Sequence, residues 1–502
     1  MAHDLIAAVD LGSNSFRLQV GRVVGNQIYP QDSIKEAVRL AAGLRADKKL
    51  DGPSQLRGLE ALSRFGERLR GFDGEAVRAV ATNTLRVAKN AAQFLAQAEA
   101  ALGFPIEVIA GREEARLIYL GVAHTLPNPR IQQLVVDIGG GSTEFIVGRN
   151  FQPYQLESLY MGCVSYTLRF FPDGKVDRRR FRAAELAART EVQAIAETYR
   201  HTGWEEAVGS SGTAKAITDL LELNHLNPGG SPGITREGLE RLRDLLFKAG
   251  EASRLKLEGI RADRIPVLPG GLAIMSAVFA ELGLQSMTFS EGALRLGVLY
   301  DLLGRYHHDD LRGATVSQFM QRYEVDRRQA ARVGQTALDL LGQLDPACAS
   351  EDHPDTQILT WAARMHEIGI SVAHAGYHKH SAYILANADM PGFSKRDQQR
   401  LSNLVLAHRG KLERVEGAPL SPRDWLLIFC LRLAAVLHRA RSDAALSQVQ
   451  ATVCGNGYEV GFDGDWLDAS PLTAAALDDE AGHWAALGMC LRVSRAAAGR
   501  SR

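Results

Sequence analysis

The 502-residue sequence lacks several features that would place it in a specialised class of protein. Its five cysteines are scattered and include no C-x-x-C pair, which fits neither a disulfide framework nor a zinc site. Lys+Arg and Asp+Glu both number 58, so any polyanion must be bound by local clusters of positive charge. The N-terminus has no basic region ahead of a long apolar run, so we expect no signal peptide. A cytoplasmic protein is expected, with peripheral membrane association left open.

Long apolar runs and common binding strings are also missing. The apolar stretch Leu426 to Leu437 contains Arg432 and is shorter than the ~20 residues that cross a bilayer. No Gly-Lys-Ser/Thr string of a Walker loop is present. The basic run Lys175 to Arg182 belongs to a chain without net positive charge, so we expect no nucleic-acid binding.

The pattern of apolar residues divides the chain into four parts. Up to about residue 130, short β-type runs such as Phe16–Val24 alternate with helical patterns such as Ala91–Leu102, and the alternation then restarts. Alternation of this kind predicts α/β lobes with mostly parallel sheets. Later residues are almost wholly helical, until a hairpin signal at Asn456-Gly457. The expected domains are lobe I at 1–130, lobe II at 131–305, an all-α domain at 306–442 and a small β-containing domain at 443–502.

Two stretches share one pattern, AAVDLGSNSFRL at Ala7–Leu18 and VVDIGGGSTEF at Val135–Phe145. In each, an apolar strand ends in Asp, a turn of small residues follows, and apolar alternation resumes. Glycines let the main chain approach an oxyanion and point several N–H groups at it. Asp10 and Asp137 could hold a hard cation such as Mg²⁺ beside that oxyanion. Either copy alone is better explained as an ordinary hairpin turn, but one copy in each lobe predicts two facing turns that clamp a phosphate chain.

Two further segments have both a structural and a functional interpretation. AVGSSGTAKAI places a turn at Gly209 to Gly212 before a helix that begins near Thr213, and a helix N-terminus can bind an anion, although an ordinary loop explains it as well. Glu113 and Glu114 open another helix, where either could be a favourable capping charge or a base that deprotonates water. The residues alone do not choose between the two glutamates.

Several strings together resemble one known family through their order and spacing. They are DLGSNSFRL, ATNTLRVAKN, GREEARLIYLGV, DIGGGSTEF, MGCVSY, GSSGTAKA and SEGALRLGVLYDLL. They are similar to the bacterial exopolyphosphatase / guanosine pentaphosphate phosphohydrolase family, within the superfamily of acetate kinase, sugar kinases, Hsp70 and actin. HEIG, HSAYILANADMPGF and LAHRGK resemble the helical domain of its long members. The resemblance implies an α/β fold of two actin-like (RNase H-like) lobes, followed by an all-α HD-like domain and a small α+β C-terminal domain.

The resemblance also implies roles for individual residues. It makes Glu114 the catalytic base that activates water. It makes Asp137 and Glu144 Mg²⁺-associated carboxylates, and the position of Asp10 at a strand end adds Asp10 to the expected metal site. A monovalent cation such as K⁺ is also allowed. Phosphate contacts are expected from Ser13, Asn14, Arg86, Gly140, Gly141 and Ser142, and from Gly209, Ser211 and Gly212 at the third turn.

The helical domain resembles an HD phosphohydrolase with a damaged metal signature. It has no early histidine, and His366-Glu367 stands where HD enzymes have His-Asp, so we expect no second metal site. We interpret the domain as a platform, either a solvated surface or a wall for a long anion. Residues considered for that wall are His378, Lys379, His380, Arg409 and Lys411.

The expected reaction is Mg²⁺-dependent, processive release of orthophosphate from the end of inorganic polyphosphate. RNFQPYQLESLYMGCVSY and FPDG favour this exopolyphosphatase branch of the family. The first alternative is removal of the 5′-terminal phosphate of guanosine pentaphosphate. An ATP-binding protein like actin or a sugar kinase, and a non-enzymatic sensor of polyphosphate or nucleotide, are further alternatives. The resemblance also implies a homodimer.

Overall fold

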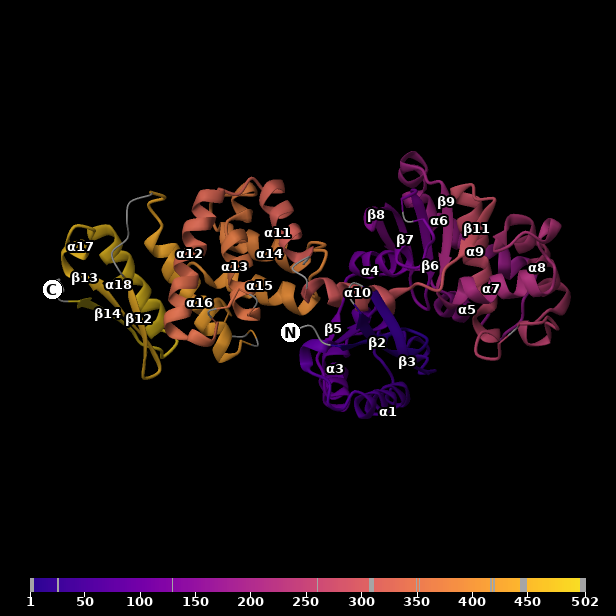
Figure 1. Cartoon of the computed structure of the whole chain (residues 1–502), viewed down its shortest axis with the longest axis horizontal. Coiled ribbons are helices and arrows are strands. Elements are labelled where there is room, and N and C mark those ends of the chain that lie inside the picture. Colours follow the sequence, from indigo (N-terminus) through magenta and orange to yellow (C-terminus); the bar gives the residue numbers. More distant parts are fainter. Residues whose placement is uncertain are drawn as a thin grey trace. The chain divides into compact units, whose positions relative to one another are not determined.

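The computed structural model describes residues 4–24, 27–128, 130–259, 261–306, 311–348, 350–351, 353–415, 418, 420–442 and 449–496. The chain folds as two compact units, residues 1–310 and 311–502. Figure 1 shows mixed α/β structure in the first unit and helices followed by a small sheet in the second. The domain boundary expected at residue 443 lies outside the described residues.

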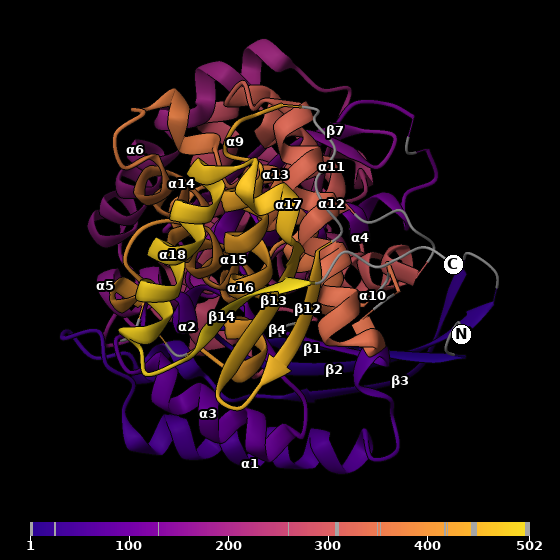
Figure 2. The same ribbon diagram turned by 90° about the vertical axis from the view of Figure 1, so that its left-hand side faces the viewer.

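The first sheet has the strand order β3-β2-β1-β4-β5. Its strands are β1 (Leu5–Leu11), β2 (Phe16–Val24), β3 (Gln27–Glu36), β4 (Val77–Ala81) and β5 (Ile106–Val108). The first three strands are antiparallel, and β4 and β5 add in parallel. Ala7, Val9 and Leu11 face the core beneath helices α1 (Gly52–Arg68) and α3 (Ala91–Leu102), whereas Ile6 and Ala8 face the opposite core. Figure 2 shows α1 and α3 together along this sheet. Because both faces of β1 are covered, its residues 6–9 are all apolar and buried.

The second sheet repeats the order of the first, with β8-β7-β6-β9-β11 extended by β10. Its strands are β6 (Gln133–Ile138), β7 (Thr143–Arg149), β8 (Gln152–Leu159), β9 (Glu206–Ser210), β10 (Ile234–Thr235) and β11 (Ser286–Phe289). Strand directions also repeat. Both sheets even shift register at the same place, at Gly21 opposite Pro30 and at Gly148 opposite Pro153. The two lobes are therefore two copies of one strand plan, as the paired sequence motifs predict.

Helices cover the outer face of the second sheet. They are α5 (Cys163–Phe170), α6 (Arg178–Thr202), α7 (Ser211–Leu223), α8 (Arg236–Ala249) and α9 (Leu268–Leu282). Within the described residues, one stretch, Ile265–Leu282, is long and apolar enough to cross a membrane by length and composition, and 67% of it is buried inside the protein. The sequence analysis overlooked this stretch. Its burial identifies it as a core helix of lobe II.

Two helices fill the space between the sheets. Helix α10 (Leu294–Tyr306) packs on β1 and β4, and α4 (Gly111–Ala123) packs on β7 and β8. Their backbones touch, because a Cβ on Gly297 would lie 1.7 Å from the Leu117 carbonyl oxygen and one on Gly121 would lie 2.2 Å from that of Ala293. Only glycine allows so close an approach.

A buried ion network ties these helices to the first sheet. Asp301 of α10 accepts hydrogen bonds from Arg78 of β4 at 2.6 Å and from Arg116 of α4 at 2.5 Å. Arg116 also bonds both carboxylate oxygens of Glu113, at 2.8 and 2.7 Å. Buried charges of this kind are tolerated only when each is paired. The network therefore fixes the first turns of α4 against α10.

The second unit combines a helical region with a three-stranded sheet. Its helices are α11 (Leu311–Arg322), α12 (Arg327–Leu344), α13 (Pro354–Met365), α14 (Tyr377–Asn387), α15 (Lys395–Ala407), α16 (Pro422–Leu437), α17 (Gly464–Asp468) and α18 (Pro471–Ala485), and its strands are β12 (Gln450–Cys454), β13 (Gly457–Asp463) and β14 (Leu491–Ala496). Figure 2 shows α18 beside this sheet. The expected hairpin is present, but its turn is Gly455-Asn456, because Cys454 pairs with Gly457. The fold class expected from the sequence is confirmed.

Candidate active site

A cavity of about 300 Å³ lies between the lobes of the first unit, where β1 and β6 end. Both predicted phosphate turns, at residues 12–15 and 139–142, contribute to its wall. Predicted site residues that line it are Asp10, Ser13, Asn14, Glu114, Asp137, Gly140, Ser142, Glu144, Ser211 and Gly212. Residues from β1, β6, α4 and α7 thus converge on one space.

The two turns touch each other. A Cβ on Gly140 would lie 2.9 Å from the Ser13 Cβ. The carbonyls of Gly139 and Gly140 accept hydrogen bonds from the first amides of α5, those of Cys163 and Val164, each at 2.9 Å. These bonds hold the second turn against α5, because the carbonyl groups of the turn point toward the first residues of this helix. The contact between turns is the facing arrangement that the repeated motif predicts.

Three carboxylates of the cavity stand on strand ends, and each has a different environment. Asp137 accepts a hydrogen bond from the Ser210 hydroxyl at 2.6 Å, and Glu144 accepts one from the Ser158 hydroxyl at 2.8 Å. Asp137 and Glu144 face each other across the β6–β7 pair. Within the described part of the chain, the Oδ1 atom of Asp10 is buried and has no hydrogen-bond partner. Such an atom is costly to bury unless a ligand completes it.

Burial raises the pKa values of these carboxyl groups. It raises the pKa of Asp10 to about 6, although Arg295 and Arg17 oppose the shift. It raises the pKa of Glu114 to about 7, against the opposing effect of Arg86 and with a further contribution from Asp10. The pKa values of Asp137 and Glu144 also rise, mainly through burial, and the neighbouring Glu114 adds to the shift of Glu144. Carboxyl groups near neutral pKa are suited to proton transfer at physiological pH.

Helix α4 presents Glu114 to the cavity, and Arg86 pairs with it. Arg86 lies in the short helix α2 (Asn83–Val87). Its Nη1 donates to Glu114 Oε2 at 3.0 Å and to the Ile109 carbonyl at 2.8 Å. The sequence analysis assigns Arg86 to phosphate, but Arg86 is not among the residues that line the cavity. Its contact in this structure is with Glu114 instead.

Two predicted glycines also lie outside the cavity wall. Gly209 belongs to β9, and the space beside it is filled by Ala214 and Met287. The strand continues to Ser210 and α7 begins at Ser211, so the expected turn at Gly209 does not form. Gly141 faces Asn83, with a Cβ position only 2.5 Å from the Asn83 Oδ1 atom. Gly141 therefore packs against Asn83 and is not among the residues that line the cavity.

Five cations in the cavity wall were missed as candidates. They are Arg17, Lys215, Arg261, Arg264 and Arg295. The sequence could have indicated Arg17, because Arg17 lies directly opposite Asp10 in the register of the β1–β2 hairpin. The guanidinium of Arg264 lies over Gly212, where a Cβ would be 1.9 Å from its Nη2 atom. Burial lowers the pKa of Arg17 to about 10, and the neighbouring Arg295 adds to this shift. This cationic wall suits a highly charged anion.

The cavity carboxylates fit a cation that takes part of its coordination from substrate. Among the described residues, only Cys348, His353 and Asp355 bring three potential ligand atoms within 4.8 Å of one another. No three of the cavity carboxylates therefore form a closed protein cage. Mg²⁺ is usually held by one or two carboxylates together with water and phosphate oxygens. The buried, unpartnered Oδ1 of Asp10 is consistent with such an open site.

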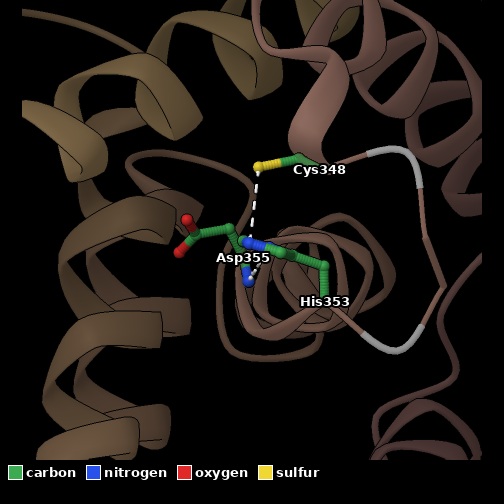
Figure 3. A group of neighbouring side chains, drawn as sticks. All are labelled: Cys348, His353 and Asp355. Atoms are coloured by element: carbon green, nitrogen blue, oxygen red, sulfur yellow. Dashed lines mark hydrogen bonds between the residues drawn. The ribbon is translucent and has the colours of Figure 1, made fainter.

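The group of Cys348, His353 and Asp355 in the second unit is already occupied by hydrogen bonds and ion pairs within the protein. Figure 3 shows His353 directed toward the Cys348 sulfur, at 3.9 Å. Asp355 already accepts hydrogen bonds from Arg400 at 2.6 Å and Arg423 at 2.8 Å. His353 Nδ1 accepts a hydrogen bond from the backbone amide of Asp355 at 3.2 Å. In a histidine that binds a metal, by contrast, the nitrogen that does not bind the metal donates a hydrogen bond. We interpret the group as a charge-balanced cap of α13.

The residues considered for an anion wall in the helical domain separate into two sets. His378 is buried, with its ring centroid 6.3 Å from that of His408. It therefore belongs to the interior and not to a surface, which corrects the assignment. Lys379, Arg409 and Lys411 are exposed, and His380 is half-buried. His366 is buried as well, and its Nδ1 lies 2.7 Å from the Ala363 carbonyl.

Comparison with known proteins places both units in one family. The Ppx/GppA phosphatase family matches residues 20–306, and Ppx/GppA phosphatase domain III matches residues 311–481. The guanosine-5′-triphosphate,3′-diphosphate pyrophosphatase of Pseudoalteromonas translucida is 38% identical over 494 residues, 98% of each chain. The Aeromonas hydrophila protein of the same name is 38% identical over 477 residues, 94% of this chain and 95% of that one.

A solved structure gives the same result. The crystal structure of the Aquifex aeolicus member of the Ppx/GppA family is 25% identical, with a TM-score of 0.51. The match covers 61% of this chain and 99% of that one.

Proposed function

The chain belongs to the Ppx/GppA phosphatase family and is a hydrolase of phosphoric anhydrides, and from this premise we propose that it removes the 5′-terminal phosphate of guanosine 5′-triphosphate 3′-diphosphate. The products are orthophosphate and guanosine 5′-diphosphate 3′-diphosphate. The substrate assignment rests on the names of two relatives that match along nearly the whole chain. These names favour the guanosine pentaphosphate alternative over the polyphosphate substrate that the sequence motifs led us to expect.

The observation that carries the reaction is the position of Glu114 in the same cavity as both turns. Glu114 accepts a proton from water as the water oxygen bonds to the terminal phosphorus. The bond from that phosphorus to the bridging oxygen breaks, and the leaving diphosphate keeps the electron pair. A pKa of about 7 suits a general base at neutral pH.

The remaining wall stabilises the charge of the transferred phosphoryl group. Its equatorial oxygens carry negative charge in the transition state, and fixed donors in a buried site stabilise this charge strongly. Arg17 and Arg295 supply positive charge next to Asp10. The contact between Gly140 and Ser13 holds one turn from each lobe at the same phosphate.

We also propose that Mg²⁺ is the cofactor. Asp10, Asp137 and Glu144 are the residues that would hold it together with phosphate oxygens, in line with the unpartnered Asp10 Oδ1 and the open arrangement of these carboxylates. When bound, Mg²⁺ supplies positive charge to the phosphate oxygens. Its charge would also oppose the burial and the mutual repulsion that raise the pKa values of Asp10 and Glu144.

Parallel assays of phosphate release test this proposal. Purified protein with Mg²⁺ is incubated with guanosine pentaphosphate, long-chain polyphosphate or ATP. We expect the highest kcat/KM with guanosine pentaphosphate. A higher kcat/KM with polyphosphate would show that the protein is an exopolyphosphatase instead. A higher kcat/KM with ATP would indicate an ATPase.

A further inference from the structure

The cavity has a buried inner end and an exposed outer end. At the inner end, the exposed fractions are 1% for Glu144, 5% for Asp137 and 7% for Glu114. At the outer end, the exposed fractions of the side chains are 31% for Asp219, 39% for Lys215 and 77% for Glu291. A terminal phosphate that reaches Glu114 therefore leaves the rest of its molecule near α7 and the end of β11.

Besides the cations of the wall, the lining of the outer end includes groups that a plain phosphate chain does not use. Asp219 and Glu291 line the cavity there, together with Phe289 and Ala216. Carboxylates repel phosphate groups, and an aromatic ring offers them no hydrogen bond. Such a lining suits an aromatic, hydrogen-bond-donating part of a substrate.

Lys215 organises this end of the cavity. Its Nζ lies 3.2 Å from Glu291, 5.1 Å from the centroid of the Phe289 ring and 3.9 Å from Asp219. The short contact is with Glu291, so Asp219 retains acceptor capacity toward the cavity. Asp219 lies one helical turn after Lys215 on α7, and a helix of this length holds both side chains on the same face.

We propose, building on the function proposed above, that Asp219 determines specificity by binding the guanine base. Guanine presents two adjacent donors, N1–H and the 2-amino group, and a carboxylate can accept both at once. Adenine has an acceptor at N1 and no 2-amino group, so it leaves the Asp219 carboxylate without partners. Inorganic polyphosphate has no donor for Asp219 at all.

The Asp219→Asn variant gives a sharp test, because it reverses one of the two hydrogen bonds. An asparagine side chain has one acceptor and one donor group. It therefore matches xanthine, which keeps N1–H but carries a carbonyl at position 2. We expect kcat/KM for guanosine pentaphosphate to fall by about 10- to 100-fold, the range for loss of a bidentate base contact. We expect the ratio of kcat/KM for the xanthosine analogue to kcat/KM for guanosine pentaphosphate to be higher in Asp219→Asn than in the wild type.

The experiment compares the wild-type, Asp219→Asn and Asp244→Asn proteins with the 5′-triphosphate 3′-diphosphates of guanosine, adenosine and xanthosine. Asp244 is a half-exposed aspartate of α8, beside Arg243 and outside the cavity wall, and its variant should behave as wild type. Binding of the same three nucleotides is measured by calorimetry with Glu114→Gln present in each protein. The nucleotides are then not hydrolysed during the measurement, and binding is measured independently of turnover.

The outcomes separate the two proposals. Unchanged ratios among the three nucleotides in Asp219→Asn, with normal turnover of guanosine pentaphosphate, would overturn the role of Asp219 and leave the proposed function standing. Guanine-selective binding that Asp219→Asn abolishes, without phosphate release by the wild type, would support Asp219 and overturn the proposed function. Absence of both turnover and guanine-selective binding would overturn both.

Discussion

Glu113 and Glu114 are neighbours in sequence but face opposite environments on α4. Glu114 meets Arg86 at 3.0 Å and lines the cavity, whereas Glu113 pairs with Arg116 at 2.7 Å in the buried network. Successive residues of an α-helix point about 100° apart, so only one of the two can face the substrate. The fold thus makes the choice between glutamates that the residue pattern leaves open.

Glu114→Gln should remove turnover and spare binding. Glutamine keeps the shape of the side chain but cannot accept a proton from water, so we expect kcat to fall by at least about 10²- to 10⁴-fold, the range for a general base. Single-turnover phosphate release and calorimetric binding of guanosine pentaphosphate measure the two properties. Asp244→Asn, at a carboxylate outside the cavity wall, is the control and should retain turnover. Similar losses in both variants would mean that the defect is structural.

The pH profile should report the ionisation of Glu114. Because burial raises its pKa to about 7, the base is protonated and inactive below neutral pH. We expect kcat/KM to rise with pH through about 7 and to level off above it. A profile that stays flat from pH 5.5 to 8 would contradict this assignment.

The same shift predicts that Glu114→Gln stabilises the protein at alkaline pH. A carboxyl group whose pKa is raised in the folded state favours folding at low pH, and this contribution is lost as pH rises toward 7. Glutamine avoids the cost of burying the charge, so its melting temperature should exceed that of wild type by about 2–6 °C at pH 8. The difference should shrink toward pH 4.5. Scanning calorimetry without Mg²⁺ checks this, and equal differences at both pH values would contradict it.

Asp10→Asn should raise the Mg²⁺ requirement. The substitution removes a negative charge at the atom that lacks a partner, and Mg²⁺ prefers charged oxygen ligands. We expect the Mg²⁺ concentration for half-maximal activity to increase at least about 10-fold, the order seen when the support of a metal site is lost. Saturating Mg²⁺ should restore part of the activity. An unchanged Mg²⁺ dependence would show that Asp10 does not contact the metal.

Gly162→Ala should displace the second phosphate turn. A Cβ at this position would lie 2.4 Å from the Gly140 carbonyl group and from the Gly141 amide, and backbone cannot move aside as a side chain can. A shift of about 1 Å in a positioning group can cost 10²-fold in rate, so we expect a loss of that order in kcat/KM. Gly74→Ala, whose Cβ would meet nothing within 4 Å, is the control. Activity near wild type in Gly162→Ala would show that the turn tolerates displacement.

The elements that the sequence predicts best are those with a buried, periodic face. The strand Phe16–Val24 and the helix Ala91–Leu102 have the same bounds in the prediction and in the structure. The analysis did not predict β3 and β8, because these sheet-edge strands alternate weakly between buried and exposed residues and β3 contains Pro30. Edge strands tolerate such polar composition.

The predicted site was incomplete for a related reason. Motifs identify residues that stand at a strand end or a turn, and those residues do converge. Arg261 and Arg264 come from a segment whose role depends on where the chain returns in space, so no local pattern identifies them. Lys215 does lie within AVGSSGTAKAI, but the analysis of that segment considered its glycines and serine and not its lysine. Arg86 shows the converse, since its motif is present but its partner in the folded chain is Glu114.

The glycine contact between α4 and α10 has a mechanical consequence. Glu114 and Arg295 lie on these two helices. The backbones of the helices are in contact at Gly121 and Gly297, and the hydrogen bond from Arg116 to Asp301 also joins them. The two phosphate turns, by contrast, belong to separate sheets. We therefore expect lobe opening to carry the base and this guanidinium as one rigid body while the turns part. Orthophosphate could then leave, and the enzyme would begin its next cycle with base and cation still in place.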